Sequence, residues 1–298
     1  HHRHTSTAKN TRQGTVANSI PGADLGRIRF TPQRLSAQNH RCIRASTVPS
    51  MTYCIGLNLD QGLIRASDSR TNAGVDDIRR TGKMRLFVSE GEYVVAALSA
   101  GNLSLTQNAL NLIDQRSTLD GGRPGIGKAT SMFDVAQLVG DALREIRKRD
   151  DAYLRDSGID ANGSFIVGGQ IRGEAPRLFL VYSEGNFIES PPEMPYFQTG
   201  ESKFGKPILD RVITPQTSLN EACKCVLVSF DSTMRSNLSV GPPLDLLLYR
   251  RDSFTANLRQ RLVEDDPYLQ TIRRQWNETL RRGVRELPGP EWLRDAED

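Results

Sequence analysis

Histidine is missing from most of this sequence. All four histidines (His1, His2, His4 and His40) fall within the first fifty residues, so residues 51–298 contain none. Ser-His-Asp and Cys-His hydrolases need imidazole as their general base, and zinc and iron sites commonly use it as a ligand. The main part of the chain therefore lacks the residue on which these classes depend, and we expect neither a metal nor a cofactor.

Cysteine and long apolar runs are also scarce. The four cysteines (Cys42, Cys54, Cys223 and Cys225) have no framework spacing, which favours a reducing cytoplasm. Cys223 and Cys225 would point to different sides of a helix, so they cannot share a metal ion, and Cys223 is interpreted as a core residue. No run of about 20 apolar residues occurs, so we expect no transmembrane helix and a cytoplasmic location.

Acidic residues are rare at the start of the chain. Residues 1–50 contain eight Lys and Arg but only one acid, Asp24. Their net charge is therefore +7, and because the whole chain carries +4, residues 51–298 carry −3. This mildly acidic body gives no reason to expect nucleic acid or an anionic membrane as a partner.

Residues 1–51 also lack apolar periodicity and the hydrophobic centre of a secretory signal. We predict that they form a disordered leader. The leader is interpreted as a propeptide, as a segment of transit-peptide composition, or as upstream sequence read through from a misplaced start, since the first methionine is Met51. It would be removed before activity and leave residues 52–298 as a single domain.

Apolar periodicity and turn signals predict the elements of this domain. The expected strands cover residues 52–59, 63–69, 83–88, 93–98, 164–168, 178–182, 186–188 and 244–249. The expected helices cover residues 102–115, 132–148 and 202–212, with a fourth opened by a capping box at Ser218 and Glu221 and a fifth beginning at Pro267. Residues 71–81 and 117–130 are expected to be loops. Hairpin-linked strands and one-sided helices indicate an α+β fold, a layered αββα sandwich.

Two polar features of the sequence are interpreted without a function. Residues 122–128 nearly match a phosphate-binding loop, but Ala129 follows where Ser or Thr would hold magnesium, and no apolar strand precedes them. We therefore predict a surface loop and no nucleotide site. The arginines of the last helix are interpreted as a solvated face, with a subunit contact as the alternative: Arg273, Arg274, Arg281 and Arg282.

The lack of histidine leaves another route to a hydrolase at Thr52. If the chain begins there, Thr52 carries a free α-amine beside its own hydroxyl, which puts a base and a nucleophile on one residue. An α-amine has a pKa of about 7.7–8, so it is substantially neutral near physiological pH. Lys83, held by Asp68, is a candidate for lowering that pKa and for stabilising developing negative charge.

Several segments resemble the Anbu family of bacterial proteasome-type proteases, which are relatives of the proteasome β-subunit and of the HslV peptidase. The most specific are MTYCIG at residues 51–56 and ASDSRTNAGVD at residues 66–76. Later segments agree: LSAGNL at 98–103, TGESKFGKP at 199–207 and SNLSVG at 236–241. The resemblance covers nearly all of residues 52–298 and not the leader.

The resemblance implies an N-terminal-nucleophile hydrolase with the four-layer αββα sandwich of a proteasome subunit. Carried over by position, it makes Thr52 the nucleophile, and Asp68 and Lys83 the catalytic carboxylate and lysine. It assigns the oxyanion-hole N–H to Gly101, a contribution often worth about 3 kcal/mol. Ser239 matches a serine that hydrogen-bonds near the terminal amine.

Two positions depart from the β-subunit pattern. Glu201 stands where β-subunits have a serine, and Ser202 is the candidate to replace it. Ser236 stands where they have an aspartate in the last catalytic segment. The network around the amine is therefore expected to be altered, which would affect peptidase activity and not the fold.

The resemblance further implies self-assembly into a ring or an open helical homo-oligomer. The preferred function is a threonine-type peptidase or amidase that acts on peptides or unfolded protein. Alternatives are an N-terminal-nucleophile acylase acting on small amides, and a catalytically silent proteasome-like scaffold. The chain carries no ATPase motif, so any unfoldase would be a separate protein.

Overall fold

The computed structural model describes residues 52–72, 78–80, 82–118 and 125–294. The chain divides into two units, His1–Ser46 and Thr47–Asp298, and all described residues belong to the second. The prediction of a leader over residues 1–51 lies outside the described residues. No helix in the described ranges combines the length and the apolar composition that crossing a membrane would need.

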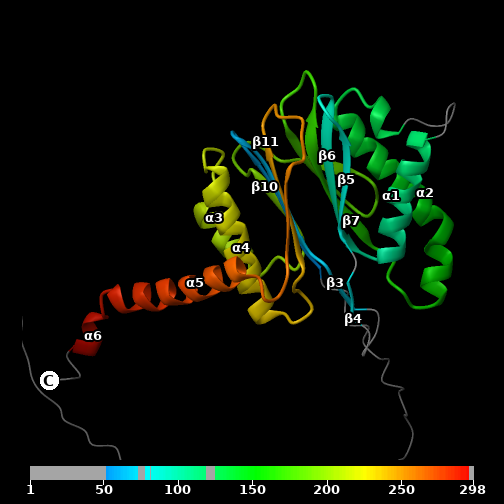
Figure 1. The fold of residues 1–298 in the computed structure, drawn as a ribbon. Helices are drawn as coiled ribbons and strands as arrows, with labels where there is room; N and C mark the ends of the chain where they lie inside the picture. Colours follow the sequence, from blue (N-terminus) through cyan, green and yellow to red (C-terminus); the bar gives the residue numbers. More distant parts are fainter. Residues whose placement is uncertain (1–51, 73–77, 81, 119–124, 295–298) are drawn as a thin grey trace, which may run out of the picture. The chain divides into compact units, whose positions relative to one another are not determined.

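Two five-stranded sheets form the centre of this unit (Figure 1). Neighbouring strands are antiparallel in both sheets, as expected. The first sheet has the order β10-β1-β2-β11-β12. Its strands are β1 (Tyr53–Leu59), β2 (Gly62–Asp68), β10 (Tyr196–Gly200), β11 (Leu244–Arg250) and β12 (Leu258–Leu262).

The second sheet has the order β5-β6-β7-β8-β9. Its strands are β5 (Met84–Ser89), β6 (Tyr93–Gly101), β7 (Gly163–Ile171), β8 (Arg177–Val181) and β9 (Phe187–Glu189). A short separate pair consists of β3 (Arg70–Asn72) and β4 (Ile78–Arg80). Glu90-Gly91 joins β5 to β6 and Glu184-Gly185 joins β8 to β9. Both glycines have positive φ (76° and 77°), which a residue with a side chain rarely adopts.

Helices cover the outer face of each sheet. α1 (Leu103–Thr118) and α2 (Met132–Asp156) lie on the second sheet, and α4 (Leu219–Ser236) lies on β1 and β2 of the first. β1 contacts β6, β7 and β8, so the two sheets face each other. The order is therefore helices, sheet, sheet, helices, and the predicted α+β layering agrees with it.

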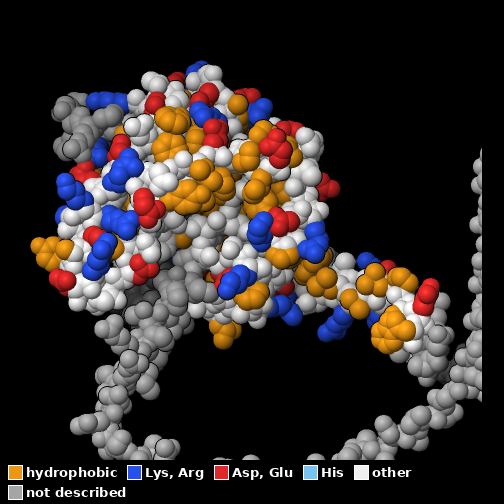
Figure 2. Space-filling view, turned by 180° about the vertical axis from the view of Figure 1, so that it is seen from behind, with side chains coloured by type: hydrophobic (Ala, Val, Ile, Leu, Met, Phe, Trp, Pro, Cys, Tyr) orange, Lys and Arg blue, Asp and Glu red, His pale blue; other side chains and the backbone are white. Residues whose placement is uncertain are grey.

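α3 (Lys206–Val212) and α5 (Pro267–Glu286) pack mainly on α4, and α3 also contacts the first sheet, where Lys206 Nζ lies 3.0 Å from Tyr196 Oη of β10. α5 runs outward from the body toward α6 (Glu291–Arg294), as Figures 1 and 2 show. The short 3-10 helix η1 (Ile126–Lys128) contacts α1. One-sided helices that cover a sheet were expected, and α5, which packs mainly on α4, departs from this.

Successive side chains of β1 point to opposite faces of the sheet, so the strand contributes to two hydrophobic clusters. Tyr53, Ile55 and Leu57 face α4, where they join a cluster that includes Phe230. Cys54, between them, points the other way and packs with residues of the second sheet such as Ile166. A third cluster lies between the second sheet and its two helices.

Arg65 is buried between the sheets, with 1% of its surface exposed. Its Nη1 donates to the carbonyls of Leu57 (2.8 Å) and Ile64 (2.9 Å), while Nε and Nη2 have no hydrogen-bond partner among the described residues. Burial lowers the pKa of the guanidinium to about 9. Gly168 makes room for this side chain, since a Cβ there would lie 1.8 Å from Arg65 Nη2.

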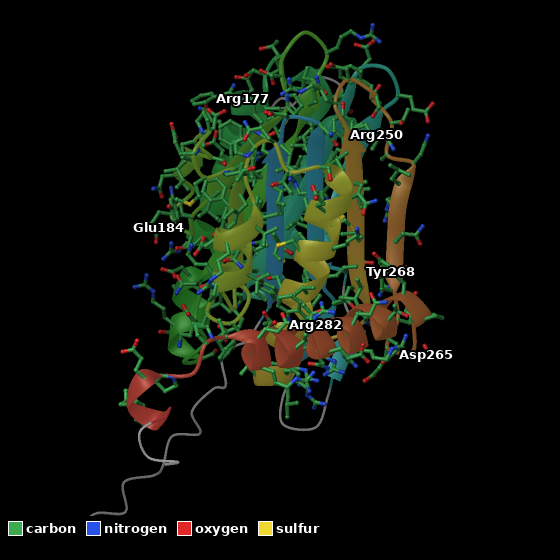
Figure 3. All side chains as sticks on the ribbon, turned by 90° about the vertical axis from the view of Figure 1, so that its left-hand side faces the viewer. Arg177, Glu184, Arg250, Asp265, Tyr268 and Arg282 are labelled. Carbon is green, nitrogen blue, oxygen red and sulfur yellow. The ribbon has the colours of Figure 1, made fainter. Side chains whose placement is uncertain are left out.

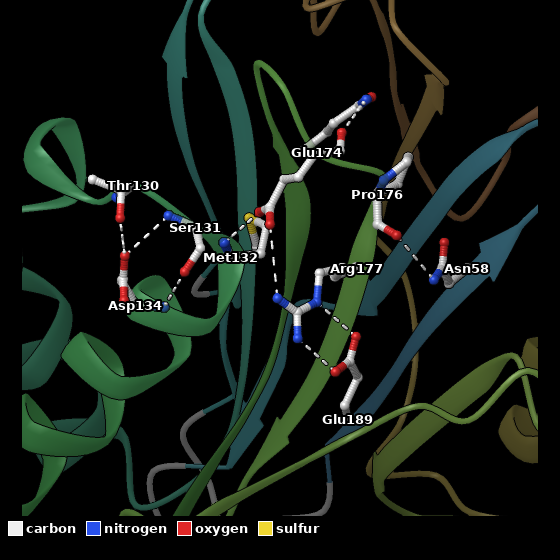
Figure 4. A network of polar contacts seen from close by, with 10 residues as sticks. Asn58, Thr130, Ser131, Met132, Asp134, Glu174, Pro176, Arg177 and Glu189 are labelled. Atoms are coloured by element: carbon white, nitrogen blue, oxygen red, sulfur yellow. Dashed lines mark hydrogen bonds and ion pairs between the residues drawn. The ribbon is translucent and has the colours of Figure 1, made fainter.

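Polar contacts fix the start of α2 and its position against β8 (Figure 4). Ser131 and Asp134 form a capping box, and the Glu174 carboxylate accepts the Met132 N–H. Arg177 donates two hydrogen bonds of 2.7 Å to Glu189 on β9. The capping box predicted at Ser218 is likewise present at the start of α4.

Several predicted boundaries are wrong. The helix expected over 202–212 begins only at Lys206, and Phe204 before it is 40% exposed. β10 and β12 were not predicted, and residues 71–81, expected as a loop, contribute to β3 and β4. Cys223 is half-buried and packs against the core, while Cys225 is the fully buried member of the pair. Because α3 and α5 both pack on α4, more than one stripe of α4 is apolar.

Candidate active site

Thr52 lies directly before β1 and is almost completely buried, with 2% of its surface exposed. Its carbonyl oxygen accepts a 2.6 Å hydrogen bond from the Glu201 N–H. Gly200 has a φ of +86°, and a Cβ there would lie 1.8 Å from the Thr52 oxygen. Only glycine lets the end of β10 approach Thr52 this closely.

The antiparallel pairing of β1 and β2 brings Asp68 to Thr52. The register pairs Cys54 with Ser67, so the end of β2 lies beside the start of β1. Asp68 Oδ1 accepts a 2.9 Å hydrogen bond from the Tyr53 N–H, the first peptide group after Thr52. The Asp68 carboxylate is thus hydrogen-bonded to the backbone of Tyr53, the residue that follows Thr52.

Lys83 completes a buried ion pair with Asp68. Its Nζ lies 2.7 Å from Asp68 Oδ1, and the two side chains are 5% and 0% exposed. The Lys83 carbonyl accepts the Ser99 N–H at 2.9 Å, which ties the lysine to β6. Burial raises the pKa of the Asp68 carboxyl above its usual value, and the attraction of Lys83 opposes that rise.

Gly101 is the last residue of β6 in the second sheet. It ends β6 opposite Gly163 and has a φ of +94°, and a Cβ there would lie 2.4 Å from the Asn162 oxygen. Its place two residues after Ser99 puts it on the strand that is hydrogen-bonded to Lys83. A side chain at position 101 would strain the backbone and clash with the Asn162 carbonyl, so the strand end requires glycine here.

Glu201 and Asn237 were not recognised as partners from the sequence. Glu201 is 5% exposed, and its carboxylate accepts the Asn237 side-chain amide at 3.0 Å and the Lys203 N–H at 3.1 Å. Asn237 Oδ1 in turn accepts the Ser239 N–H at 3.0 Å. Ser239 is therefore connected to Thr52 through Asn237 and Glu201. The sequence signal was Glu201 itself, an acidic residue where β-subunits have a serine.

The other two candidate serines lie on the surface, outside this group of hydrogen-bonded residues. Ser202 and Ser236 are exposed, and neither side chain hydrogen-bonds to this cluster within the described part of the chain. Ser236 is the last residue of α4, one position before Asn237. The structure thus brings together Thr52, Asp68, Lys83 and, through Glu201, Ser239.

Competing chemistry at this place is limited. Cys54 Sγ donates to the Ser99 carbonyl at 3.6 Å, and burial raises the pKa of its thiol, so it is not an activated nucleophile. Across the described ranges, no group of three or more His, Cys, Asp or Glu side chains could hold a metal ion. Among the described residues, the Asp68 carboxylate with its partner Lys83 reaches the Tyr53 N–H, and the Glu201 N–H reaches the Thr52 carbonyl.

Solved structures of similar proteins share this fold. Anbu (ancestral beta-subunit) from Yersinia bercovieri is 46% identical, with a TM-score of 0.75 over 80% of this chain and 99% of that one. Anbu from Hyphomicrobium sp. strain MC1 is 44% identical, with a TM-score of 0.73 over 80% and 99%. In the helical assembly of the Anbu complex from Pseudomonas aeruginosa, the values are 47% and 0.76 over 80% and 98%. The chain belongs to the Anbu family.

The family resemblance inferred from the sequence is thereby confirmed. A comparison with protein-family models and another with curated proteins each gave no match. In this Anbu-family chain, the segments that carried the resemblance are also those that converge in space. Residues 51–56 and 66–76 contain Thr52 and Asp68, and residues 199–207 and 236–241 contain Glu201 and Asn237.

Proposed function

We propose that this Anbu-family chain is a threonine-type peptidase or amidase of the N-terminal-nucleophile class. The observation that carries the proposal is the hydrogen-bonded Lys83–Asp68 pair, which is buried beside Thr52. Asp68 of this pair also accepts the Tyr53 N–H. A buried ion pair alone is weak support for stability, since desolvation offsets much of its attraction. Its position next to the candidate nucleophile Thr52 favours a catalytic role.

In the proposed reaction, the Thr52 hydroxyl attacks the carbonyl carbon of an amide. The Thr52 α-amine takes the hydroxyl proton and then gives it to the leaving nitrogen as the C–N bond breaks. Lys83 stabilises the hydroxyl oxygen as it becomes more negative, and the Gly101 N–H stabilises the carbonyl oxygen. Water then cleaves the ester on Thr52, with the amine again as the base, and releases the acid.

This mechanism requires the peptide bond before Thr52 to be broken. An amide nitrogen has no basic lone pair, so a chain that retains residues 1–51 would lack the base. We therefore propose that removal of these residues precedes activity. The intact mass of the natively expressed protein tests this step, because a mature chain must begin at Thr52.

The catalytic assignment is tested with the mature protein and a panel of fluorogenic peptides and small amides. Thr52→Ala should abolish hydrolysis, and Thr52→Ser should retain part of it. Ser157→Ala, which changes an exposed serine directly after α2, is the control and should leave the rate unchanged. Hydrolysis that survives Thr52→Ala would refute the mechanism, and cleavage of small amides alone would favour the acylase.

We also propose that the chain assembles with copies of itself. Support comes from the 47% identical Anbu complex from Pseudomonas aeruginosa, which forms a helical assembly. A heterologous contact between copies closes into a ring or continues as a helix, depending on one rotation. Sedimentation velocity of the mature protein tests self-association, and a monomer at all concentrations would exclude it.

A further inference from the structure

Tyr53 joins the candidate nucleophile to the core of the protein. It is the first residue of β1, directly after Thr52, and its side chain is completely buried. The centroid of its ring lies 4.7 Å from that of Phe230 on α4, at an interplanar angle of 59°. Figures 1 and 3 show α4 lying across the face of the first sheet. Tyr53 therefore fixes the start of β1 against this helix.

The phenol of Tyr53 ends among buried polar side chains from two other elements. Its Oη lies 2.6 Å from Ser229 Oγ on α4, and it accepts a hydrogen bond from the Gln198 side-chain amide on β10. Because the Gln198 amide donates, the phenol O–H is left to donate to Ser229. Burial raises the pKa of the Tyr53 phenol, so this group stays neutral and acts as a hydrogen-bonding anchor rather than as an acid or a base.

Gly205 leaves the space that the phenol occupies. A Cβ at this position would lie 2.0 Å from Tyr53 Oη and 2.3 Å from Ser229 Oγ. Gly205 lies directly before α3, four residues after Glu201, whose N–H donates to the Thr52 carbonyl. The segment that contacts Thr52 therefore also packs on the phenol. β1, β10, α4 and the segment after β10 thus meet at one hydroxyl group.

The position of Thr52 depends on these contacts once residue 52 is the first of the chain. A chain terminus is poorly ordered unless neighbouring contacts hold it. Backbone hydrogen bonds hold this one on two sides: the Glu201 N–H donates to the Thr52 carbonyl at 2.6 Å, and Asp68 accepts the Tyr53 N–H at 2.9 Å. Gln198 lies on β10, three residues before Glu201, so the Tyr53 phenol also fixes the strand that leads to the Glu201 N–H.

We propose that Tyr53 is a positioning residue for hydrolysis at Thr52, and that its phenol, held by Ser229 and Gln198, sets the place of the Thr52 hydroxyl. The inference rests on the proposed function. A nucleophile has to be held within about 0.5 Å of its productive place, and a displacement of about 1 Å can lower a rate roughly a hundredfold. Loss of the phenol contacts should therefore lower kcat. KM should change little, because buried Tyr53 presents no surface to a substrate.

The first test measures kcat and KM of the mature protein with the fluorogenic peptide or small amide that the wild type cleaves fastest. Tyr53→Phe removes the hydroxyl and keeps the ring. It should lower kcat roughly ten- to a hundredfold and change KM by less than about threefold. An unchanged kcat in Tyr53→Phe, in a wild type that hydrolyses the probe, would overturn the positioning role alone. A wild type that cleaves no probe would overturn the proposed function and this inference together.

Tyr249→Phe is the matched control. Tyr249 is 1% exposed, and its hydroxyl donates to Gln170 at 2.6 Å. It pairs with Leu63, five residues and roughly 17 Å along β2 from Asp68. Figure 3 labels its neighbour Arg250 at this far end of the sheet. Tyr249→Phe should lower the urea midpoint about as much as Tyr53→Phe and leave kcat within about twofold of the wild type.

A shape-matched variant separates positioning from stability. Tyr53→Phe/Gln198→Met/Ser229→Ala removes the three polar groups together, so none of them is left unpaired, and the urea midpoint should return toward that of the wild type. Its kcat should stay low, because no directional contact then holds the ring. Recovery of kcat together with the midpoint would show that the cluster only stabilises the fold, and would overturn the proposal.

Gly205→Ala tests the same contact without removing a polar group. The new Cβ would displace the phenol from its place between Ser229 and Gln198. This variant should lower kcat at least about tenfold with a nearly constant KM. A wild-type kcat in Gly205→Ala would contradict the dependence of Thr52 on the phenol, and this result can be read even where Tyr53→Phe does not fold.

Discussion

Glu201 and Asn237 connect the end of β10, beside Thr52, with the loop that follows α4. We predict that the double substitution Glu201→Gln/Asn237→Asp preserves this connection, and that either single substitution breaks it. In Glu201→Gln, the single remaining carbonyl oxygen cannot accept both the Asn237 amide and the Lys203 N–H, which now bond to separate carboxylate oxygens. In Asn237→Asp, two carboxylates face each other in a buried position.

The magnitudes follow from burial and charge. A hydrogen bond to a charged group contributes about 1.5–3 kcal/mol, so Glu201→Gln should lower the free energy of unfolding by roughly that amount. Asn237→Asp should cost about 1–3 kcal/mol, because it places a second carboxylate against buried Glu201 at a half-buried position. In Glu201→Gln/Asn237→Asp, the glutamine amide donates to the new aspartate and every hydrogen bond is kept. The coupling free energy of the pair should therefore be about 1–3 kcal/mol and favourable.

The assay is urea unfolding of all four proteins at one protein concentration, since self-association would otherwise shift apparent stability. Glu193→Gln, a change of an exposed acid before β10, is the control and should alter stability by less than about 0.5 kcal/mol. Additive effects of the two single changes would refute the direct carboxylate–amide connection. Under the proposed function, recovery of hydrolysis in the double variant would extend the same conclusion to the site.

Two other changes test buried contacts by urea unfolding. Lys83→Met leaves the Asp68 carboxylate without its cation, so we expect a loss of about 3–5 kcal/mol at neutral pH. Because burial raises the folded-state pKa of Asp68, the variant should be most stable below the ordinary pKa of an aspartate and lose stability as the pH rises through the raised value; an equal loss at acid and neutral pH would contradict this. Gly168→Ala places a Cβ 1.8 Å from Arg65 Nη2 and should cost about 1–3 kcal/mol by overpacking. Gly127→Ala, with a nearest neighbour at 3.7 Å, should cost less than about 0.5 kcal/mol, and similar losses for both glycines would refute the tight packing around Arg65.

The strands and helices that were predicted well carry their information locally. β1 and β2 alternate apolar residues around an Asp-x-Gly turn, and α4 opens with a capping box. The two-sheet arrangement then follows from hairpins that need a second apolar layer. β10 was not predicted because its pairing partner, β1, lies far away in the sequence. No local turn signal indicates a hairpin at this strand.

The candidate site shows the same difference between what local sequence indicates and what only long-range contacts determine. The absence of histidine and the position of Thr52, Asp68 and Lys83 at strand ends could be read from the sequence, and the structure places these residues together. The link between Glu201 and Asn237 joins residues 36 positions apart through side chains. Neither a glutamate nor an asparagine specifies such a partner by its type alone, so the Glu201–Asn237 contact can be recognised only in the folded structure.

The two departures from the β-subunit pattern acquire a common physical explanation. Ser236 was expected to matter because it stands at a catalytic position, yet it is exposed, and Asn237 beside it makes the inward contact. Glu201 occupies the buried place beside Thr52, whereas Ser202 points to solvent. A carboxylate on the β10 side therefore requires a donor on the α4 side, and Asn237 supplies it. The two segments are thus joined by a carboxylate–amide pair, and Glu201 is also the residue whose backbone N–H donates to the Thr52 carbonyl.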